Sequence, residues 1–217
     1  MPCGCIVAAY LGLHFVSGTP HTMTFELERW ANNSWGLHDI DRDERSGTIM
    51  VYSDGSRSNK VTAKYFKHYF FAHSNHYAHT IYLRPTNSIY EVNDDKRSAV
   101  YRKCSCTWQE LVMPESGPTC DGAAQAHLGK ARRIGEGVVA GIRVIRYDGS
   151  VSGTHTEAAF APDHNCDLFE ELRMTYNSLG LPTSRHRFVV RSYSPGEPSR
   201  EYLFPPPGYA LSEASKY

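Results

Sequence analysis

Three histidines lie close together between residues 73 and 79, at a spacing that could serve metal binding or acid–base catalysis. On a helical turn, His73, His76 and His79 would share one face and could bind a transition metal. On a strand, His73 and His79 would point one way and His76 the other. The segment lacks the pair of histidines around a glutamate that marks a metal hydrolase helix. A polar segment is the simpler interpretation, and the three histidines are kept as candidate catalytic residues.

Carboxylates offer a second route to a metal site. Residues 39–44 begin like a calcium-binding loop, but the glycine and the closing glutamate that such a loop needs are missing. We therefore predict a solvated acidic turn over these residues. Asp94, Asp95 and Asp163 are further candidate oxygen ligands. Calcium is the ion that these carboxylates would bind, and no other cofactor is predicted.

Four cysteines follow the N-terminal apolar run: Cys104, Cys106, Cys120 and Cys166. They allow three pairings, and none of them forms the C-x-x-C pair of a zinc site. Cys104 and Cys106 would point the same way on a strand, which suits two separate disulfides better than a bond between them. We predict one or two disulfides in an oxidising compartment, with Cys106–Cys120 as a pair that would close a short loop. Four buried thiols are the alternative.

No motif marks a serine nucleophile or a phosphate site. The chain has no G-x-S-x-G sequence and no alternation of strands and helices, which argues against an α/β-hydrolase. The glycines of residues 135–141 run into a β pattern instead of opening a helix, so we interpret them as sheet bends or bulges. His164 could activate Cys166 as a thiolate, but a disulfide or a buried thiol explains Cys166 more simply.

Charge and composition narrow the function classes. Lys plus Arg and Asp plus Glu both number 23, so the chain has no basic excess for a nucleic acid. The apolar run at residues 5–16 has the length of a signal-peptide core but no preceding Lys or Arg, and it is too short to span a bilayer. We predict residues 1–20 as a truncated export signal or a first strand, and residues 21–217 as a single β-barrel-like domain.

Strand patterns dominate the rest of the chain. Residues Met23–Trp30 alternate apolar and polar side chains, as a half-buried strand does. Thr80–Arg84 and Ser88–Val92 predict a hairpin, and the segment from Leu111 to Lys130 predicts a loop with one short helix at Ala123–Leu128. Nine or ten strands with so little helix predict a mainly β fold, a strongly curved antiparallel sheet that forms an open (half) barrel.

Three motifs in the last third of the chain resemble those of a known class. Residues Val139–Tyr147 read Val-Ala-Gly-Ile-Arg-Val-Ile-Arg-Tyr, Ala159–Asp163 read Ala-Phe-Ala-Pro-Asp, and Phe204–Tyr209 read Phe-Pro-Pro-Pro-Gly-Tyr. Over about residues 45–210 the chain resembles the periplasmic and outer-membrane lipoprotein carriers, the Lol-type open β-barrels of the bacterial envelope, and their relatives of unknown function. The resemblance implies a curved sheet around an apolar cup that holds acyl chains. The middle cysteines are not part of that general pattern.

These observations predict a periplasmic or cell-envelope protein of bacteria that binds a hydrophobic small molecule or lipid through its acyl chain. A curved sheet with so little helix leaves an apolar face that needs a ligand or a partner. The first alternative is a calcium-dependent hydrolase of acylated lactones or esters such as N-acyl homoserine lactones, whose metal would polarise the carbonyl and supply hydroxide. The second is a structural or partner-binding envelope module. Peripheral membrane contact is a further expectation, and no oligomeric state is predicted.

Overall fold

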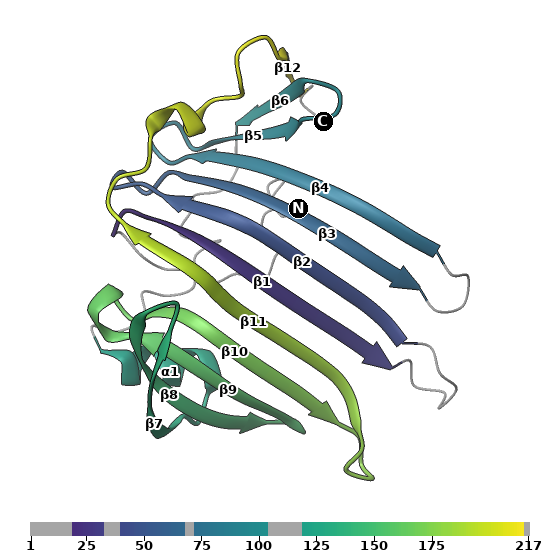
Figure 1. Ribbon diagram of the computed structural model, residues 1–217, viewed down its shortest axis with the longest axis vertical. Coiled ribbons are helices and arrows are strands. Elements are labelled where there is room, and N and C mark those ends of the chain that lie inside the picture. Colours follow the sequence, from purple (N-terminus) through teal and green to yellow (C-terminus); the bar gives the residue numbers. More distant parts are fainter. Residues whose placement is uncertain (1–18, 33–39, 68–71, 104–118, 215–217) are drawn as a thin grey trace.

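The computed structural model describes residues 19–32, 40–67, 72–103 and 119–214, which form one open sheet (Figure 1). Its strands lie in the order β12-β6-β5-β4-β3-β2-β1-β11-β10-β9-β8-β7. All neighbours are antiparallel except β12 and β6, which are parallel. The strands are β1 (His21–Asn32), β2 (Ile40–Val51), β3 (Arg57–Lys67), β4 (Ala72–Leu83), β5 (Ser88–Asn93), β6 (Ser98–Lys103), β7 (Arg132–Val139), β8 (Ile142–Val151), β9 (Thr154–Ala161), β10 (Asp167–Tyr176), β11 (Pro182–Pro195) and β12 (Ala210–Glu213).

The predicted fold class is confirmed, with twelve strands instead of nine or ten. β12 and β7 lie at opposite edges of the sheet, so the sheet does not close (Figure 1). The motif Val139–Tyr147 spans the end of β7 and the start of β8. Ala140 and Gly141, both with positive φ, form the tight turn between β7 and β8. A register shift between Arg133 and Gly135 is a bulge of the kind that the glycines predicted.

One helix and two short 3-10 segments complete the described fold. The helix α1 (Cys120–Leu128) begins three residues before the predicted start, because the side chain of Thr119 accepts a hydrogen bond from the backbone N–H of Gly122. It ends at Gly129, whose φ of 76° suits glycine. The 3-10 segments are η4 (Pro162–His164) and η5 (Arg200–Leu203). In the described part of the chain, no helix is long and apolar enough to cross a membrane.

The apolar residues form two cores on opposite faces of the sheet. The larger core joins α1 to one face, and its central members are Met23, Phe25, Leu27, Ile49, Val61, Tyr147, Phe160, Phe188 and Val190. The smaller core lies on the other face near β4–β6, where Leu203 and Tyr209 of the C-terminal segment pack on Ile81 and Val92. Phe204, the residue after Leu203, is 57% exposed.

Gly47 allows β2 and β3 to pack closely beside the ring of Phe25. A Cβ atom there would lie 2.3 Å from the backbone oxygen of Lys60 and 3.0 Å from the Phe25 ring. We expect Gly47→Ala to lower the free energy of unfolding by about 2 kcal/mol, since the backbone must move to accept it. Gly135→Ala is the control, because its Cβ would meet nothing within 4 Å. Urea denaturation of both variants tests this, and equal losses would contradict it.

Candidate functional site: the two faces of the open sheet

The face that carries α1 is apolar across seven neighbouring strands. The register aligns Val61, Gly47, Phe25 and Val190 in one row from β3 to β11. A second row continues from Phe188 through Glu171 and Ala158 to Tyr147 on β8. The apolar residues named in these two rows are at most 3% exposed. This face is named the apolar face below.

The helix α1 packs on only one end of the apolar face. Its main contacts are with β8 and β9 (Figure 1), and its His127 reaches Glu171 on β10. A disulfide joins Cys120 at its first residue to Cys166 before β10. The Tyr147 hydroxyl donates a hydrogen bond of 2.6 Å to Asp121, and burial, followed by that hydrogen bond, raises the pKa of Tyr147 to about 12. The apolar residues of β1, β2 and β3 lie beyond the strands that α1 contacts.

A buried carboxylate forms a third link between α1 and the apolar face. Glu171 on β10 is 3% exposed, and its two oxygens lie 2.5 Å from His127 Nε2 on α1 and 3.2 Å from His186 Nδ1 on β11. Arg173 forms an ion pair of 3.1 Å with the same carboxylate. Burial raises the pKa of Glu171, but the hydrogen bonds from the two histidines and the charge of Arg173 outweigh it. The net shift of this pKa is downward.

The apolar face has a polar end formed by the first residues of β1 and the last of β11. His21 is fully buried, and its ring stacks on that of Tyr193 with 4.9 Å between the centroids. The ring of His164, on η4, lies 4.5 Å from that of Tyr193. Burial lowers the pKa of His21 and raises that of Tyr193 to about 12. Among the described residues, neither His21 Nε2 nor the Tyr193 hydroxyl has a hydrogen-bond partner. Two polar groups at the end of an apolar surface could bind the polar group of a ligand.

The opposite face is charged and carries three shallow grooves. The central groove has a volume of about 370 Å³ and crosses β3, β2, β1 and β11. A second groove of about 350 Å³ continues over β10 and β9 and shares Arg187 with the first. A third, of about 400 Å³, lies toward β4. This side is named the polar face. It was not recognised in the sequence, because its charges come from strands far apart in the chain.

Of the three predicted histidines, the structure describes the side chain of His79 only, on β4. Its Nδ1 lies 3.7 Å from Asp94 Oδ1, so two of the predicted site residues are brought together. The Tyr209 hydroxyl donates a hydrogen bond of 2.9 Å to the same carboxylate. Burial and the charge of Lys60 lower the pKa of His79. The side chains of His73 and His76 lie outside the described residues.

The other predicted carboxylates do not join this pair. Asp95 is an exposed residue of the β5–β6 turn, and Asp163 is exposed in η4. The acidic turn was predicted over residues 39–44. That prediction is wrong for residues 40–44, because they form the start of β2. Its Asp43 is 8% exposed and is held by two hydrogen bonds from Arg45 Nε and Nη2 to Oδ2, at 2.9 and 2.6 Å. Among the described residues, no three His, Cys, Asp or Glu side chains converge on a metal position.

Two of the four predicted cysteines form the disulfide Cys120–Cys166. This bond excludes the suggested pairing of Cys106 with Cys120, and it also excludes a thiolate at Cys166. Cys104 and Cys106 lie outside the described residues. The pairing could not be read from the sequence, because Cys166 follows a left-handed Asn165 after η4, a local geometry that turns it toward α1.

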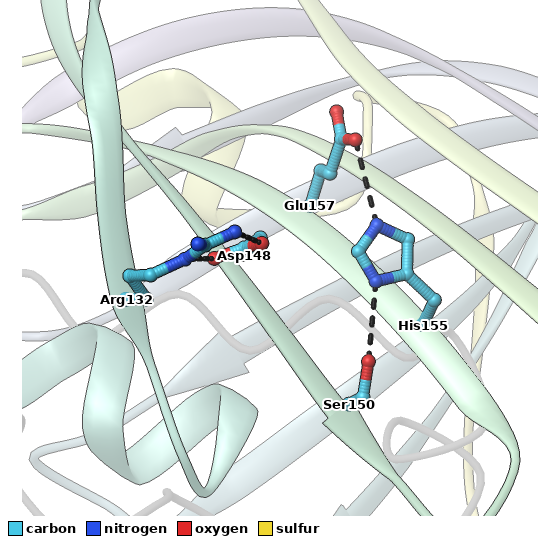
Figure 2. A network of polar contacts seen from close by, with 5 residues as sticks. All are labelled: Arg132, Asp148, Ser150, His155 and Glu157. Carbon is cyan, nitrogen blue, oxygen red and sulfur yellow. Dashed lines mark hydrogen bonds and ion pairs between the residues drawn. The ribbon is translucent and has the colours of Figure 1, made fainter.

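A serine, a histidine and a glutamate form a chain of contacts on the polar side of β8 and β9 (Figure 2). Ser150 Oγ lies 3.2 Å from His155 Nδ1, and His155 Nε2 lies 3.5 Å from Glu157 Oε1. Nucleophilic hydrolases use these three residue types. However, the side chains of His155 and Glu157 are 38% and 49% exposed, and Ser150 lines none of the three grooves. Water competes for such contacts, so we assign no catalytic role to them.

No protein-family model matches the chain, and no curated protein matches it. Similar solved structures include the MucA/MucB complex of Pseudomonas aeruginosa, at 15% identity and a TM-score of 0.42, which covers 86% of this chain and 55% of the matched chain. The chain thus spans about half the length of that relative. A LolA superfamily protein from Nitrosomonas europaea matches at 7% identity and a TM-score of 0.28, over 88% and 92% of the two chains. A putative outer membrane lipoprotein-sorting domain from Vibrio parahaemolyticus matches at 8% identity and a TM-score of 0.25. The match covers 90% of this chain and 93% of the matched chain. Lipoprotein-sorting proteins, the class suggested by the late sequence motifs, are therefore among the structural neighbours, at low TM-score and identity.

Proposed function

We propose that this protein binds the acyl chain of a lipid or of an acylated molecule on the apolar face of its sheet, as a binding protein of the bacterial cell envelope. The observation that carries the proposal is the mismatch between the apolar face and its helix. The face extends from β3 to β8, whereas the nine-residue α1 contacts β8, β9 and, through His127, Glu171 on β10. The side chains of this face are buried, so an acyl chain would bind by entering the apolar interior beside β1, β2 and β3, as hydrophobic ligands do in apolar pockets.

The polar end of the apolar face supports the same proposal. An acyl ligand has one polar group at the end of an apolar chain, and His21 and Tyr193 offer polar atoms at the end of an apolar surface. The disulfide supports an oxidising compartment such as the periplasm. Peripheral membrane contact would follow from the delivery of such a ligand, and it is part of the proposal.

We prefer binding to hydrolysis as the activity. The proposed lactone or ester hydrolase needs a metal position beside the apolar face, with several ligands from one small region. The pair of His79 and Asp94 is the one observation in its favour. By the strand register, His79 lies in a row with Lys60 and Thr48, on the polar face. A hydrolytic centre there would lie on the wrong side of the sheet for an acyl chain on the apolar face.

Enlarging a side chain on the apolar face should block the ligand. Ala63 on β3 is 7% exposed and lies outside the strands that α1 contacts. We expect Ala63→Phe to weaken the binding of a dansyl-labelled fatty acid by about tenfold, since the ring would occupy space that the chain needs. Fluorescence titration measures the affinity of each variant.

The neighbouring Thr62 provides the matched control, because it is exposed and points to the polar face. Thr62→Phe should bind the fatty acid as the unmodified protein does. Mass spectrometry of lipids released from the purified, unmodified protein gives a readout that needs no variant. Absence of both co-purified lipid and fatty-acid binding would contradict the proposal, and so would equal binding by the two variants.

A further inference from the structure

The central groove and the groove over β10 and β9 form one continuous surface across the sheet, since Arg187 lines both. The register places Lys64, Glu44, Glu28 and Arg187 side by side on β3, β2, β1 and β11. The same row continues through Leu172 and Glu157 to Asp148 and Arg132 at the edge strand β7. The last three of these residues appear together in Figure 2. The C-terminal segment covers the polar face near β3–β6, where Tyr202 lies over Lys60. All members of the row are at least partly exposed.

Most carboxylates of this surface are already paired with an arginine. Arg42 pairs with Glu28 and Glu44 at 3.2 and 2.6 Å. Arg191 pairs with Glu26, and Arg146 with Glu170 at 2.7 Å. These pairs neutralise most of the acidic side chains that line the grooves.

Three cations of the same surface have no carboxylate partner among the described residues. Lys64, Arg185 and Arg187 line the grooves, and no carboxylate of the described residues lies within 4.0 Å of their charged atoms. Arg185 and Arg187 are two residues apart on β11 and lie on the same face, while Lys64 is three strands away. The surface therefore has an excess of positive charge at fixed positions, although the whole chain has none.

We propose that this part of the polar face is a docking surface for an acidic, extended segment of a partner protein. Arginine binds carboxylates in a planar, two-point geometry, and lysine adds a point charge. Neighbouring strands are about 4.8 Å apart, so Lys64 and Arg187 are separated by about 14 Å. An extended chain rises about 3.3 Å per residue, so acidic side chains about four residues apart would reach both cations.

The surface fits a protein segment better than a bilayer. A bilayer surface is wide and favours many cations with few carboxylates between them. Here Glu28 and Glu44 lie between Lys64 and Arg187 and would face the same lipid phosphates. An acidic segment that extends from Lys64 to Arg187 would pass over Glu44 and Glu28, whose charges Arg42 already pairs. It needs acidic side chains only where it meets the free cations. This partner binds on the face opposite to the proposed lipid, so the two proposals can fail independently.

The test is fluorescence anisotropy of a labelled, glutamate-rich peptide with the full chain at low ionic strength. We expect Lys64→Gln/Arg187→Gln to weaken the binding of this peptide by about tenfold, from the loss of two exposed charge contacts. Lys103→Gln/Lys130→Gln removes the same charge from exposed positions outside the grooves and should change the affinity by less than about twofold. A lysine-rich peptide of equal length should not bind, and added salt should weaken the glutamate-rich peptide.

Thermal unfolding of both double variants shows whether they fold alike, and Lys64→Gln alone serves if the double variant does not fold. Equal binding by the two double variants would overturn the proposal. So would a lack of binding by the unmodified protein, or equal binding of the lysine-rich peptide. Groove-dependent binding to phosphatidylglycerol vesicles without binding to the peptide would also overturn it, since the surface would then contact a membrane.

Discussion

Replacing Cys120 and Cys166 together by alanine is expected to lower the free energy of unfolding by about 4 kcal/mol. The bond joins residues separated by 46 positions and so restricts a long loop of the unfolded chain. It also fixes the first residue of α1, a helix of nine residues that is too short to be stable alone. Urea denaturation followed by far-ultraviolet circular dichroism measures the change.

Reduction of the unmodified protein is the matched control, because it breaks the same bond without changing a side chain's size. It should shift the urea midpoint as far as the double alanine variant does. A loss below about 1 kcal/mol would mean that α1 is held by its polar contacts instead of the disulfide. Fatty-acid binding by the variant then becomes informative, since α1 lies at one end of the apolar face.

The strands could be predicted from the sequence because their signals are local. In β1, the side chains of Met23, Phe25 and Leu27 are buried and alternate with Thr24 and Glu26, which is the pattern that the sequence shows. The hairpin of β4 and β5 was likewise predicted from two short runs and the turn between them. Periodicity and turn residues determine these features over a few residues.

The order of the strands could not be predicted in the same way. β1 pairs with β11, and Thr24 hydrogen-bonds to Ser192 at a sequence separation of 168 residues. No local pattern specifies such a pair. The polar face depends on this pairing, because it brings Arg187 beside Glu28. Its charged grooves were therefore missed, while the histidine and aspartate clusters that are local in sequence were noticed.

Glu170 and Glu171 illustrate why a buried site residue can escape sequence analysis. They are neighbours on a strand and so point to opposite faces. The register shift between Leu168 and Glu170 decides which of the two glutamate side chains points toward α1. Because of this bulge, Glu170 pairs with Arg146 on the polar face and Glu171 is buried on the apolar face. An alternating pattern without the bulge carries no such information.

Glu171→Gln is expected to lower the free energy of unfolding by about 3 kcal/mol at neutral pH. The amide would remove the charge that His127, His186 and Arg173 surround, and its NH2 group would meet donors on those side chains. Glu213→Gln is the control, since Glu213 is exposed on β12. Thermal or urea unfolding of both variants gives the difference, and equal losses would contradict the structural role.

The pH dependence of stability provides an independent test of the same carboxylate. The pKa of Glu171 is lower in the folded state than its ordinary value of 4.5. A carboxylate of this kind stabilises the folded state above its unfolded pKa, and this stabilisation is lost as the pH falls through its folded pKa. The unmodified protein should therefore lose stability as the pH is lowered below 4.5, and Glu171→Gln should lose less over the same interval. The free energies of unfolding of the two proteins could instead fall in parallel as the pH is lowered. Glu171 would then not be the charged group that holds α1 on the sheet. The disulfide and the Tyr147–Asp121 hydrogen bond would hold the helix without it.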